Sequence, residues 1–210
     1  MFSEGDVILF TGDSITDCGR NRERPDSCGD GYANLLKSYL LYQHPNQNLT
    51  IYNKGISGNR IVDLYARFKE DCYNLSPTLI SILIGVNDVW HEFSRKQGVE
   101  TDKFGRIYDL LLEETKQRLT GVKLVMLEPF VLAGGLPIGK YSQWRKEINL
   151  RQEIVRRLAG QHGAIFVPLQ TSFDEACQIA PDTYWLYDGV HPTAAGHALI
   201  AEEWTKAVLT

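Results

Sequence analysis

The sequence predicts an α/β fold of three layers, in which a five-stranded parallel sheet lies between two layers of helices. Short apolar runs alternate along the chain with longer segments of helical period, and this alternation is typical of strands joined by covering helices. Most of the short runs are apolar at consecutive positions, as expected for strands buried on both faces. The 210 residues contain no repeat or linker, so we expect one domain over residues 1–210.

The expected elements follow from this pattern. Five apolar runs are the expected strands: Val7–Phe10, Leu49–Asn53, Leu79–Ile84, Lys123–Leu127 and Ile165–Val167. Five segments of helical period are the expected helices: Tyr32–Tyr42, Ile61–Cys72, Asp102–Leu119, Ser142–Gln161 and Ala194–Val208. The first helix is expected to turn one apolar stripe toward the sheet: Tyr32, Leu35, Leu36, Tyr39 and Leu40. Thr193 is the expected N-cap of the last helix.

One segment after the fourth expected strand is rich in turn residues. Pro129–Tyr141 contains three glycines and two prolines, which predicts a surface loop. It would lie over the carboxyl edge of the sheet, where ligands bind in open α/β folds. Such a loop is either one wall of a pocket or a plain connection.

Composition and charge are those of an average globular protein, with 43% hydrophobic and 23% charged residues. The 22 Lys and Arg residues against 26 Asp and Glu give a net charge of −4, and the basic residues form no dense stripe. Nucleic acid is therefore not an expected partner. The N-terminus lacks the features of a signal peptide, and the longest apolar run, Leu79 to Val86, is too short to span a bilayer. We expect a cytoplasmic protein that does not bind membranes.

The four cysteines, Cys18, Cys28, Cys72 and Cys177, show no C-x-x-C spacing. A chain of this length needs no disulfide framework, so reduced thiols are expected. Cys18 lies near the candidate nucleophile described below, but no paired base stands beside it in the sequence. A catalytic thiol is the less favoured interpretation.

The first expected strand runs directly into Thr11, Gly12, Asp13 and Ser14. Glycine permits a sharp turn at the end of the strand, and such a turn would hold the Ser14 hydroxyl at the carboxyl edge of the sheet. A serine hydroxyl is a poor nucleophile unless a base lies within hydrogen-bond reach. Taken alone, Gly-Asp-Ser is also consistent with an ordinary turn.

A candidate base lies near the other end of the chain, where Asp188 precedes His191 by three residues. On a tight loop, such an aspartate can accept the imidazole Nδ1–H, which fixes the tautomer and leaves Nε2 to face a serine. The alternatives are a surface turn with an incidental histidine and a metal site shared with His197. The spacing of the two histidines across a helix start does not suit a ligand pair, so no metal is expected.

Two further segments are expected to end at the same edge of the sheet. The letters ISGN, which include Gly58, follow the second strand, and GVND, which include Asn87 and Asp88, follow the third. A developing oxyanion needs preorganised donors, and a glycine N–H and an asparagine amide supply them. Each segment also fits a structural role, Gly58 in a turn and Asn87 with Asp88 in a helix cap.

The four blocks GDSIT, ISGN, GVND and DGVHP resemble the SGNH/GDSL hydrolase family in content and in order. The resemblance extends from Gly12 to Gly196, nearly the whole chain. It implies a flavodoxin-like SGNH hydrolase fold and a serine esterase that needs no metal or organic cofactor.

The resemblance also implies roles for five residues of the four blocks. Ser14 would be the nucleophile, His191 the general base and acid, and Asp188 its orienting partner. The backbone N–H groups of Ser14 and Gly58 and the Asn87 side chain would form the oxyanion hole.

Longer stretches, FTGDSITDCGR, NKGISGN, IGVNDVW and VHPTAAGH, resemble the branch of intracellular carbohydrate acetylesterases that includes acetylxylan esterases. This resemblance implies a small ester substrate, with acetylated xylo-oligosaccharides as the expected one. Residues in or beside the blocks are either substrate contacts or ordinary packing and surface residues: Asp13, Arg60, Trp90, Trp185 and Tyr187.

Two other functions remain open at the level of sequence. A lysophospholipase or a broad short-chain ester or thioester hydrolase of the same family would share the four blocks. A non-catalytic carbohydrate-binding protein on a hydrolase fold would normally lack one of the five block residues. Association into a homo-oligomer is a further option that no interface signature decides.

Overall fold

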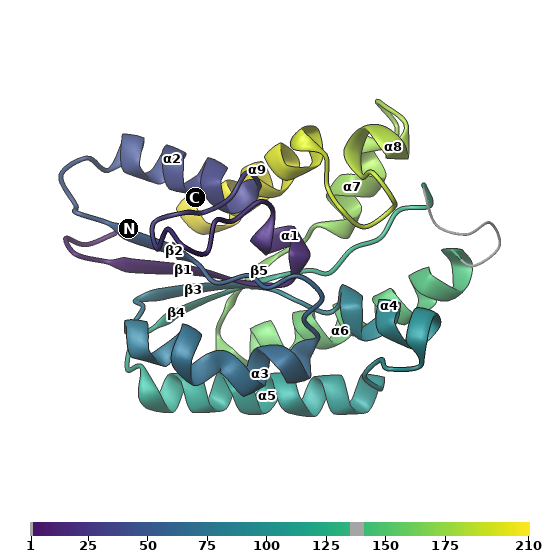
Figure 1. Cartoon of the computed structure of the whole chain (residues 1–210), viewed down its shortest axis with the longest axis horizontal. Helices are drawn as coiled ribbons and strands as arrows, with labels where there is room; N and C mark the ends of the chain where they lie inside the picture. Colours follow the sequence, from purple (N-terminus) through teal and green to yellow (C-terminus); the bar gives the residue numbers. More distant parts are fainter. Residues whose placement is uncertain (1, 135–140) are drawn as a thin grey trace.

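The computed structural model describes residues 2–134 and 141–210 and shows the predicted three layers (Figure 1). Five strands form the sheet: β1 (Val7–Gly12), β2 (Thr50–Asn53), β3 (Leu79–Leu83), β4 (Lys123–Leu127) and β5 (Ile165–Val167). Their order is β2-β1-β3-β4-β5 and every neighbouring pair is parallel, which is the flavodoxin-like arrangement. The predicted fold class is confirmed.

Helices cover both faces of the sheet. They are α1 (Ser14–Asp17), α2 (Tyr32–Gln43), α3 (Ile61–Asp71), α4 (Val86–Arg95), α5 (Thr101–Arg118), α6 (Tyr141–His162), α7 (Gln170–Ala176), α8 (Asp182–Trp185) and α9 (Ala194–Leu209), with a 3-10 turn η1 (Tyr73–Leu75). In Figure 1, α2, α7 and α9 lie above the sheet, whereas α3, α5 and α6 lie below it. The two helices that follow β1 and β3 directly, α1 and α4, stand at the carboxyl edge of the sheet.

The sheet separates two hydrophobic cores, and successive strand residues belong to opposite ones. Ile8 and Phe10 pack into the core shared with α2 and α9, whereas Leu9 packs into the core shared with α3, α5 and α6. All three are fully buried, which explains why this strand is apolar at consecutive positions. Trp204 of α9 is also fully buried, and its indole N–H donates to Ser81 Oγ of β3 over 3.0 Å. This one side chain joins the upper helix layer to the centre of the sheet.

The predicted strands and helices agree with the structure to within two residues at their ends. Thr193 is confirmed as the N-cap of α9, because its hydroxyl accepts the Gly196 N–H at 3.2 Å. The ten-residue helix α4 lies outside the expected helices. Val86, Val89, Trp90 and Phe93 lie at i, i+3, i+4 and i+7, so an apolar face does mark this helix in the sequence, and the prediction missed it. The helices α1, α7 and α8 are too short to show a helical period.

The predicted stripe of α2 is only partly correct. Tyr32, Leu36 and Leu40 are buried, but Leu35 is 42% exposed and Tyr39 is 41% exposed. The helix packs against α9 as well as over the sheet. These neighbours cover the i, i+4, i+8 row of side chains and leave the i+3 and i+7 positions at the margin.

The segment expected as a surface loop is buried where it begins. Phe130 and Val131 are fully buried in the upper core. The Gln170 side-chain amide accepts the Val131 N–H at 3.0 Å and donates to the Val131 carbonyl at 3.1 Å, so the backbone is satisfied without a strand partner. The surface prediction is therefore wrong for residues 129–132. Residues 135–140 of the predicted loop lie outside the described residues.

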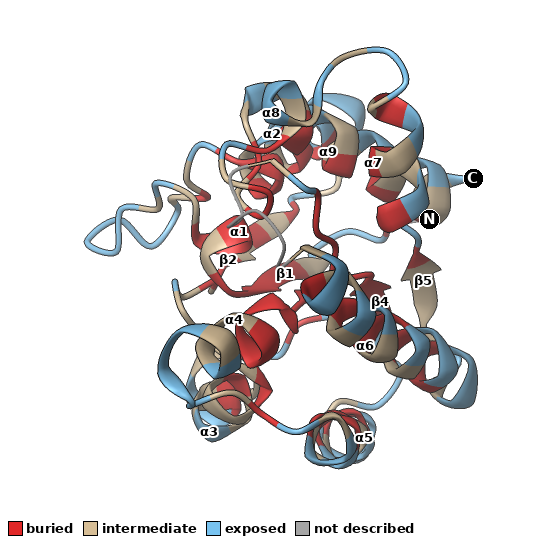
Figure 2. Ribbon diagram, turned by 90° about the vertical axis from the view of Figure 1, so that its right-hand side faces the viewer, coloured by how far each residue is buried: buried red, intermediate tan, exposed pale blue. Residues whose placement is uncertain are grey.

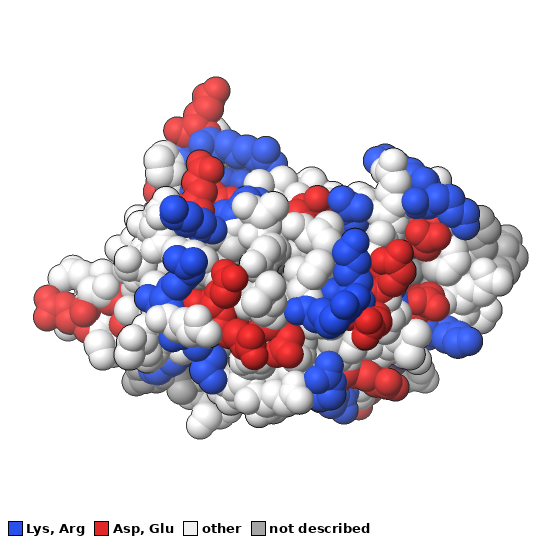
Figure 3. All heavy atoms as spheres, turned by 90° about the horizontal axis from the view of Figure 1, so that it is seen from below, with Lys and Arg blue, Asp and Glu red and all other residues white. Residues whose placement is uncertain are grey.

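The face below α3 and α5 carries charges of both signs (Figure 3). Lysines and arginines are interspersed there with aspartates and glutamates, so this face lacks the continuous positive surface that a nucleic acid backbone binds. Within residues 2–134 and 141–210, the helices are all too short or too polar to cross a membrane.

Replacing Trp204 by alanine should lower the free energy of unfolding by about 3–5 kcal/mol, because loss of a fully buried indole leaves a cavity. Urea unfolding followed by circular dichroism measures this change. Ile179→Ala is the control, since Ile179 is 85% exposed and its truncation should change stability by less than about 0.5 kcal/mol. Equal losses for the two variants would contradict the structural role of Trp204.

Candidate active site

The turn after β1 places Ser14 at the carboxyl edge of the sheet, which Figure 2 shows end-on with α1 above β1 and α4 below it. Gly12 ends β1 with a φ of +152°, and a Cβ there would lie 2.0 Å from the Leu83 carbonyl oxygen of β3. Only glycine fits this close approach. Asp13 then caps α1, its Oδ1 accepting the Ile15 N–H at 3.0 Å, so Ser14 is the first residue of the helix.

Ser14 and His191, 177 positions apart in the chain, are in direct contact. The Ser14 Oγ lies 2.9 Å from His191 Nε2, and His191 Nδ1 lies 2.7 Å from Asp188 Oδ2. An ionised carboxylate can only accept, so Nδ1 carries the hydrogen and Nε2 accepts the serine O–H. The structure thus brings these three predicted residues into one hydrogen-bonded array, which has the geometry of a nucleophile with its base.

The Asp188 carboxylate also stabilises the loop that carries His191 by accepting backbone hydrogen bonds. Its Oδ1 accepts the Val190 N–H at 3.0 Å and the His191 N–H at 2.8 Å. Burial opposes ionisation of Asp188, but the hydrogen bonds from the amide and imidazole of His191 hold its pKa below the usual range. The aspartate is therefore ionised at neutral pH, and it holds the histidine by both backbone and ring.

Donors suited to an oxyanion lie on the two loops predicted to supply them. The Gly58 N–H has no hydrogen-bond partner among residues 2–134 and 141–210, and its φ of +83° is one that glycine adopts without strain. Asn87, in the first turn of α4, is 7% exposed. One of its amide hydrogens binds the Asn59 carbonyl oxygen at 3.1 Å, which leaves the other for a ligand. The same contact links the loop after β2 to the first turn of α4.

Asp17 ties the loop after β2 to the helix of the nucleophile. Its Oδ2 accepts the Ser57 N–H at 2.9 Å and the Ser57 hydroxyl at 3.0 Å. Burial opposes ionisation, but these bonds and the neighbouring Arg22 and Arg20 hold the pKa of Asp17 below its usual range. The sequence pattern did not single out Asp17. Its position three residues after Ser14, on the same short helix, was the available signal.

A second set of polar contacts joins α1, α2 and α9. Tyr32 Oη lies 2.9 Å from Thr16 Oγ1, and the Tyr32 N–H donates to His197 Nδ1 at 3.1 Å. Burial, with a smaller effect of His191, lowers the pKa of His197 to about 4. His197 is therefore neutral at pH 7, and its Nδ1 can accept. These contacts connect the first turn of α9, just after His191, to the helix that begins with Ser14.

Two carboxyl groups beside the array are buried. Asp13 is 1% exposed and Asp88 is fully buried. Burial raises the pKa of Asp13 to about 7 and that of Asp88 to about 8. Both Asp88 oxygens lie near the Ile61 N–H, at 3.1 and 3.2 Å, whereas Asp13 Oδ2 has no partner among the residues that the structure describes. Both groups are mostly protonated at pH 6 and ionise as the pH rises.

Two of the five expected substrate contacts border the array. The Trp90 ring lies 5.8 Å from the His191 ring, and Tyr187, next to Asp188 in the chain, is 69% exposed. Trp144 of α6 packs edge-to-face on Trp90 at 5.3 Å. The sequence pattern did not single out Trp144, because it lies in a helix far from any of the four blocks.

In the other three expected contact residues, the polar groups are buried or bound to neighbouring groups of the protein. Asp13 is buried against α1 as described above. Arg60 donates to the carboxylate of Asp63 at 2.8 Å, and the Trp185 indole N–H donates to the Ala176 carbonyl at 3.1 Å. These groups serve the local fold around the site in this structure.

The cysteines and the remaining acidic and histidine residues offer no competing chemistry in the described part of the chain. All four cysteines are free, and burial raises the pKa of the Cys18 thiol, with Asp30 and Asp17 adding to the effect. A raised pKa keeps this thiol protonated. Within residues 2–134 and 141–210, no three His, Cys, Asp or Glu side chains are grouped so that they could hold a metal ion.

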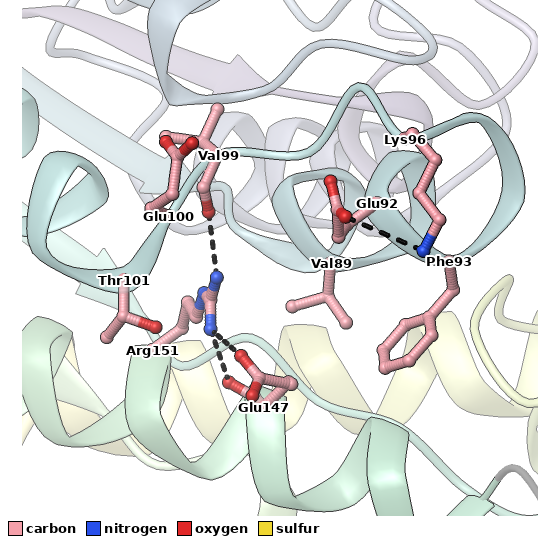
Figure 4. A pocket seen from close by; sticks show the side chains of 9 residues that line it. All are labelled: Val89, Glu92, Phe93, Lys96, Val99, Glu100, Thr101, Glu147 and Arg151. Atoms are coloured by element: carbon pink, nitrogen blue, oxygen red, sulfur yellow. Dashed lines mark hydrogen bonds and ion pairs between the residues drawn. The ribbon is translucent and has the colours of Figure 1, made fainter.

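A cavity of about 490 Å³ lies between α4, α6 and the segment that joins α4 to α5 (Figure 4). The Arg151 guanidinium donates to the Val99 carbonyl at 2.8 Å and pairs with Glu147, and Lys96 pairs with Glu92. None of the three array residues lines this cavity. Its cations are already neutralised within the protein, so the chemistry is expected at the sheet edge instead.

Known proteins resemble this chain over nearly its whole length. Residues 10–199 match the model of the GDSL-like lipase/acylhydrolase family. An acetylxylan esterase of Geobacillus stearothermophilus is 32% identical, and the match covers 97% of this chain and 94% of the relative.

Solved structures agree with this relationship. A GDSL-like protein from Parabacteroides merdae has a TM-score of 0.94 at 38% identity, covering 99% of this chain and 97% of that one. Axe2, an acetylxylan esterase from Geobacillus stearothermophilus, has a TM-score of 0.88 at 31% identity, covering 98% of this chain and 95% of that one. Variants of Axe2 with one serine or one aspartate changed to alanine are described as catalytic mutants.

Asp88→Asn should become more stabilising, relative to the wild type, as the pH rises from 6 to 9. The unfolded chain releases the Asp88 proton near pH 4, whereas the folded protein keeps it up to about pH 8, so wild-type stability is lost as the pH rises through this window. Asparagine does not titrate and can still accept the Ile61 N–H. Melting temperatures at pH 6, 7, 8 and 9 measure the difference.

Asp63→Asn is the matched control for this experiment. Although burial opposes ionisation of Asp63, its hydrogen bonds to Arg60 hold the pKa below the usual range, so it stays ionised from pH 6 to 9. The melting difference for Asp63→Asn should therefore not vary over this range. A flat difference for Asp88→Asn as well would show that Asp88 is not held protonated by burial.

Proposed function

Because this chain belongs to the GDSL-like lipase/acylhydrolase family and is a carboxylic ester hydrolase, we propose that it removes acetyl groups from carbohydrate through an acetyl-enzyme on Ser14. The observation that carries the proposal is the 2.9 Å contact between Ser14 Oγ and His191 Nε2, with Asp188 behind the imidazole. A serine within reach of an oriented base is what acyl transfer at neutral pH requires.

In the first step, His191 Nε2 takes the Ser14 proton while Oγ forms a bond to the acetyl carbonyl carbon. Asp188 stabilises the imidazolium through its 2.7 Å contact with Nδ1. The carbonyl oxygen becomes an oxyanion, and the N–H groups of Ser14 and Gly58 and the Asn87 amide stabilise it by hydrogen bonds.

The tetrahedral intermediate then loses the sugar. The bond between the carbonyl carbon and the sugar oxygen breaks, and the imidazolium Nε2–H gives its proton to that oxygen, so the acetyl group remains on Ser14. In the second step, His191 takes a proton from water as the water oxygen attacks the acetyl carbon. Collapse of this second intermediate returns the proton to Ser14 and releases acetate.

Two observations support a sugar as the leaving group. The chain is 32% identical over nearly its whole length to an acetylxylan esterase, and Axe2, which shares its fold, is described by the same activity. Trp90 lies beside the His191 ring, and the exposed Tyr187 directly precedes Asp188 in the chain. Flat aromatic side chains at the border of a site suit the apolar faces of sugar rings.

Ser14→Ala should lower kcat for acetate release by about 10⁴-fold or more, because no other nucleophile is in contact with His191 in the described structure. Asn87→Ala should cost about 10²–10³-fold, as expected for one oxyanion donor. Ser172→Ala, which changes a serine on α7 outside the array, is the control and should keep wild-type activity. Near-wild-type activity of Ser14→Ala, in a preparation free of other esterases, would refute the proposed nucleophile.

The acyl preference separates an acetylesterase from a lipid hydrolase of the same family. Across nitrophenyl esters from acetate to octanoate, kcat/KM should be highest for acetate, because the relatives that support the proposal act on acetyl groups. Acetate release from acetylated xylo-oligosaccharides should exceed that from a simple alkyl acetate at the same concentration. A preference for long acyl chains would favour a lysophospholipase, and equal rates on the two acetates would contradict a sugar-specific site.

A further inference from the structure

One arginine outside all four sequence blocks contacts both the turn after β1 and the loop after β2. Arg67 lies on α3, and its Nε donates to Asn59 Oδ1 at 2.6 Å. Its Nη1 donates to the Lys54 carbonyl at 2.7 Å, and its Nη2 donates to the Gly12 carbonyl at 3.0 Å. Asp71, one helical turn further along α3, accepts from Nη1 at 2.7 Å. Every nitrogen of the guanidinium is therefore in use.

These acceptor atoms belong to the segments that carry the site residues. Gly12 is two residues before Ser14, so its carbonyl belongs to the turn that carries the nucleophile. Asn59 follows Gly58 directly, and the Asn59 carbonyl also accepts the Asn87 amide at 3.1 Å. A single rigid group thus links the turn of the nucleophile to the loop that carries Gly58, and this loop contacts Asn87 through the Asn59 carbonyl.

The environment of Arg67 keeps this link fixed. Its side chain is 14% exposed, and although burial lowers the pKa, the adjacent Asp71 supports the charged form. Guanidinium is planar and presents its donors in a fixed fork, so it can hold three separate oxygens at set angles. Lysine has one nitrogen at the end of a flexible stem and cannot reproduce this geometry.

We propose that Arg67 is a positioning residue, which sets the distance between the Ser14 hydroxyl and the oxyanion donors Gly58 and Asn87. This inference rests on the proposed ester hydrolysis through Ser14. Arg67 does not touch the reacting atoms, and it acts through Gly12 and Asn59. A displacement of about 1 Å between a nucleophile and its oxyanion donors is enough to slow a reaction by about 10²-fold.

The fold does not depend on Arg67 for the backbone contacts that it makes. The Gly12 carbonyl also accepts the Ile56 N–H at 3.1 Å, and the Lys54 carbonyl accepts the Thr11 hydroxyl at 3.3 Å. Loss of the guanidinium therefore leaves each of these carbonyls with a donor. What is lost is the contact of one rigid group with both segments and with the Asn59 side chain.

The test is kinetic. Arg67→Gln and Arg67→Lys should each lower kcat for nitrophenyl acetate hydrolysis by about 10–100-fold, with KM changed by less than about threefold, because the loss is confined to the transition state. Arg106→Gln, which breaks an exposed i,i+4 pair with Asp102 on α5, is the matched control and should keep the wild-type kcat. A rise in KM at unchanged kcat, or wild-type kinetics for both Arg67 variants, would overturn the proposal.

A double-mutant cycle distinguishes positioning from a general loss of structure. In an Asn87→Ala background, Arg67→Gln should lower kcat by a smaller factor than in the wild type, because one of the two donors that it positions is already absent. The same 10–100-fold loss in both backgrounds would overturn the proposal. Millimolar guanidinium should also restore part of the kcat of Arg67→Ala, and failure of this rescue in a folded variant would count against it.

A second variant covers the case in which Arg67 substitutions do not fold. Asn59→Ala removes only the Nε contact and leaves Arg67 bound to Asp71 and the two carbonyls. It should lower kcat in the same direction without changing the melting temperature by more than a few degrees, and an unchanged kcat would overturn the proposal. If the wild type itself released no acetate and Ser14 were not labelled by a serine-directed phosphonate, the proposed function would fail instead.

Discussion

The contact between Ser14 and His191 depends on the docking of α9 against the rest of the molecule. The two residues come from opposite ends of the chain, and no local element joins them. Trp204 inserts from α9 into the centre of the sheet and bonds Ser81, and His197 in the first turn of the same helix accepts the Tyr32 N–H. Because both contacts are buried, the loop before α9 has one position relative to α1. Anything that loosens α9 should therefore separate the nucleophile from its base before it unfolds the sheet.

The order of the strands explains why the other donors meet at the same place. β1 lies between β2 and β3, and all three run in the same direction, so the segments that follow them emerge side by side. Ser14, Gly58 and Asn87 each lie within five residues of a strand end. Proximity alone does not give angstrom-level placement, however. The close approach at Gly12 and the hydrogen bonds of Asp17 and Arg67 supply it.

Electrostatics at this edge work against stability. Asp13 and Asp88 are buried within electrostatic reach of each other, and burial disfavours their charged forms. The positive charge that His191 gains during the proposed reaction favours the ionised form of Asp13.

Local sequence patterns were enough to predict most of the elements and the set of chemically suited residues. Runs such as Val7–Phe10 are apolar at every position because both faces of a parallel strand are buried, and Ser14 with Asp188 could be read from local turns. Contacts between residues that are far apart in the sequence depend on how the segments pack in the tertiary structure. The exposure of Leu35, the burial of Val131 and the bonds of Arg67 each depend on neighbours far away in the chain. Local patterns record period and turn chemistry, whereas the partner of a side chain is set when separate segments pack together.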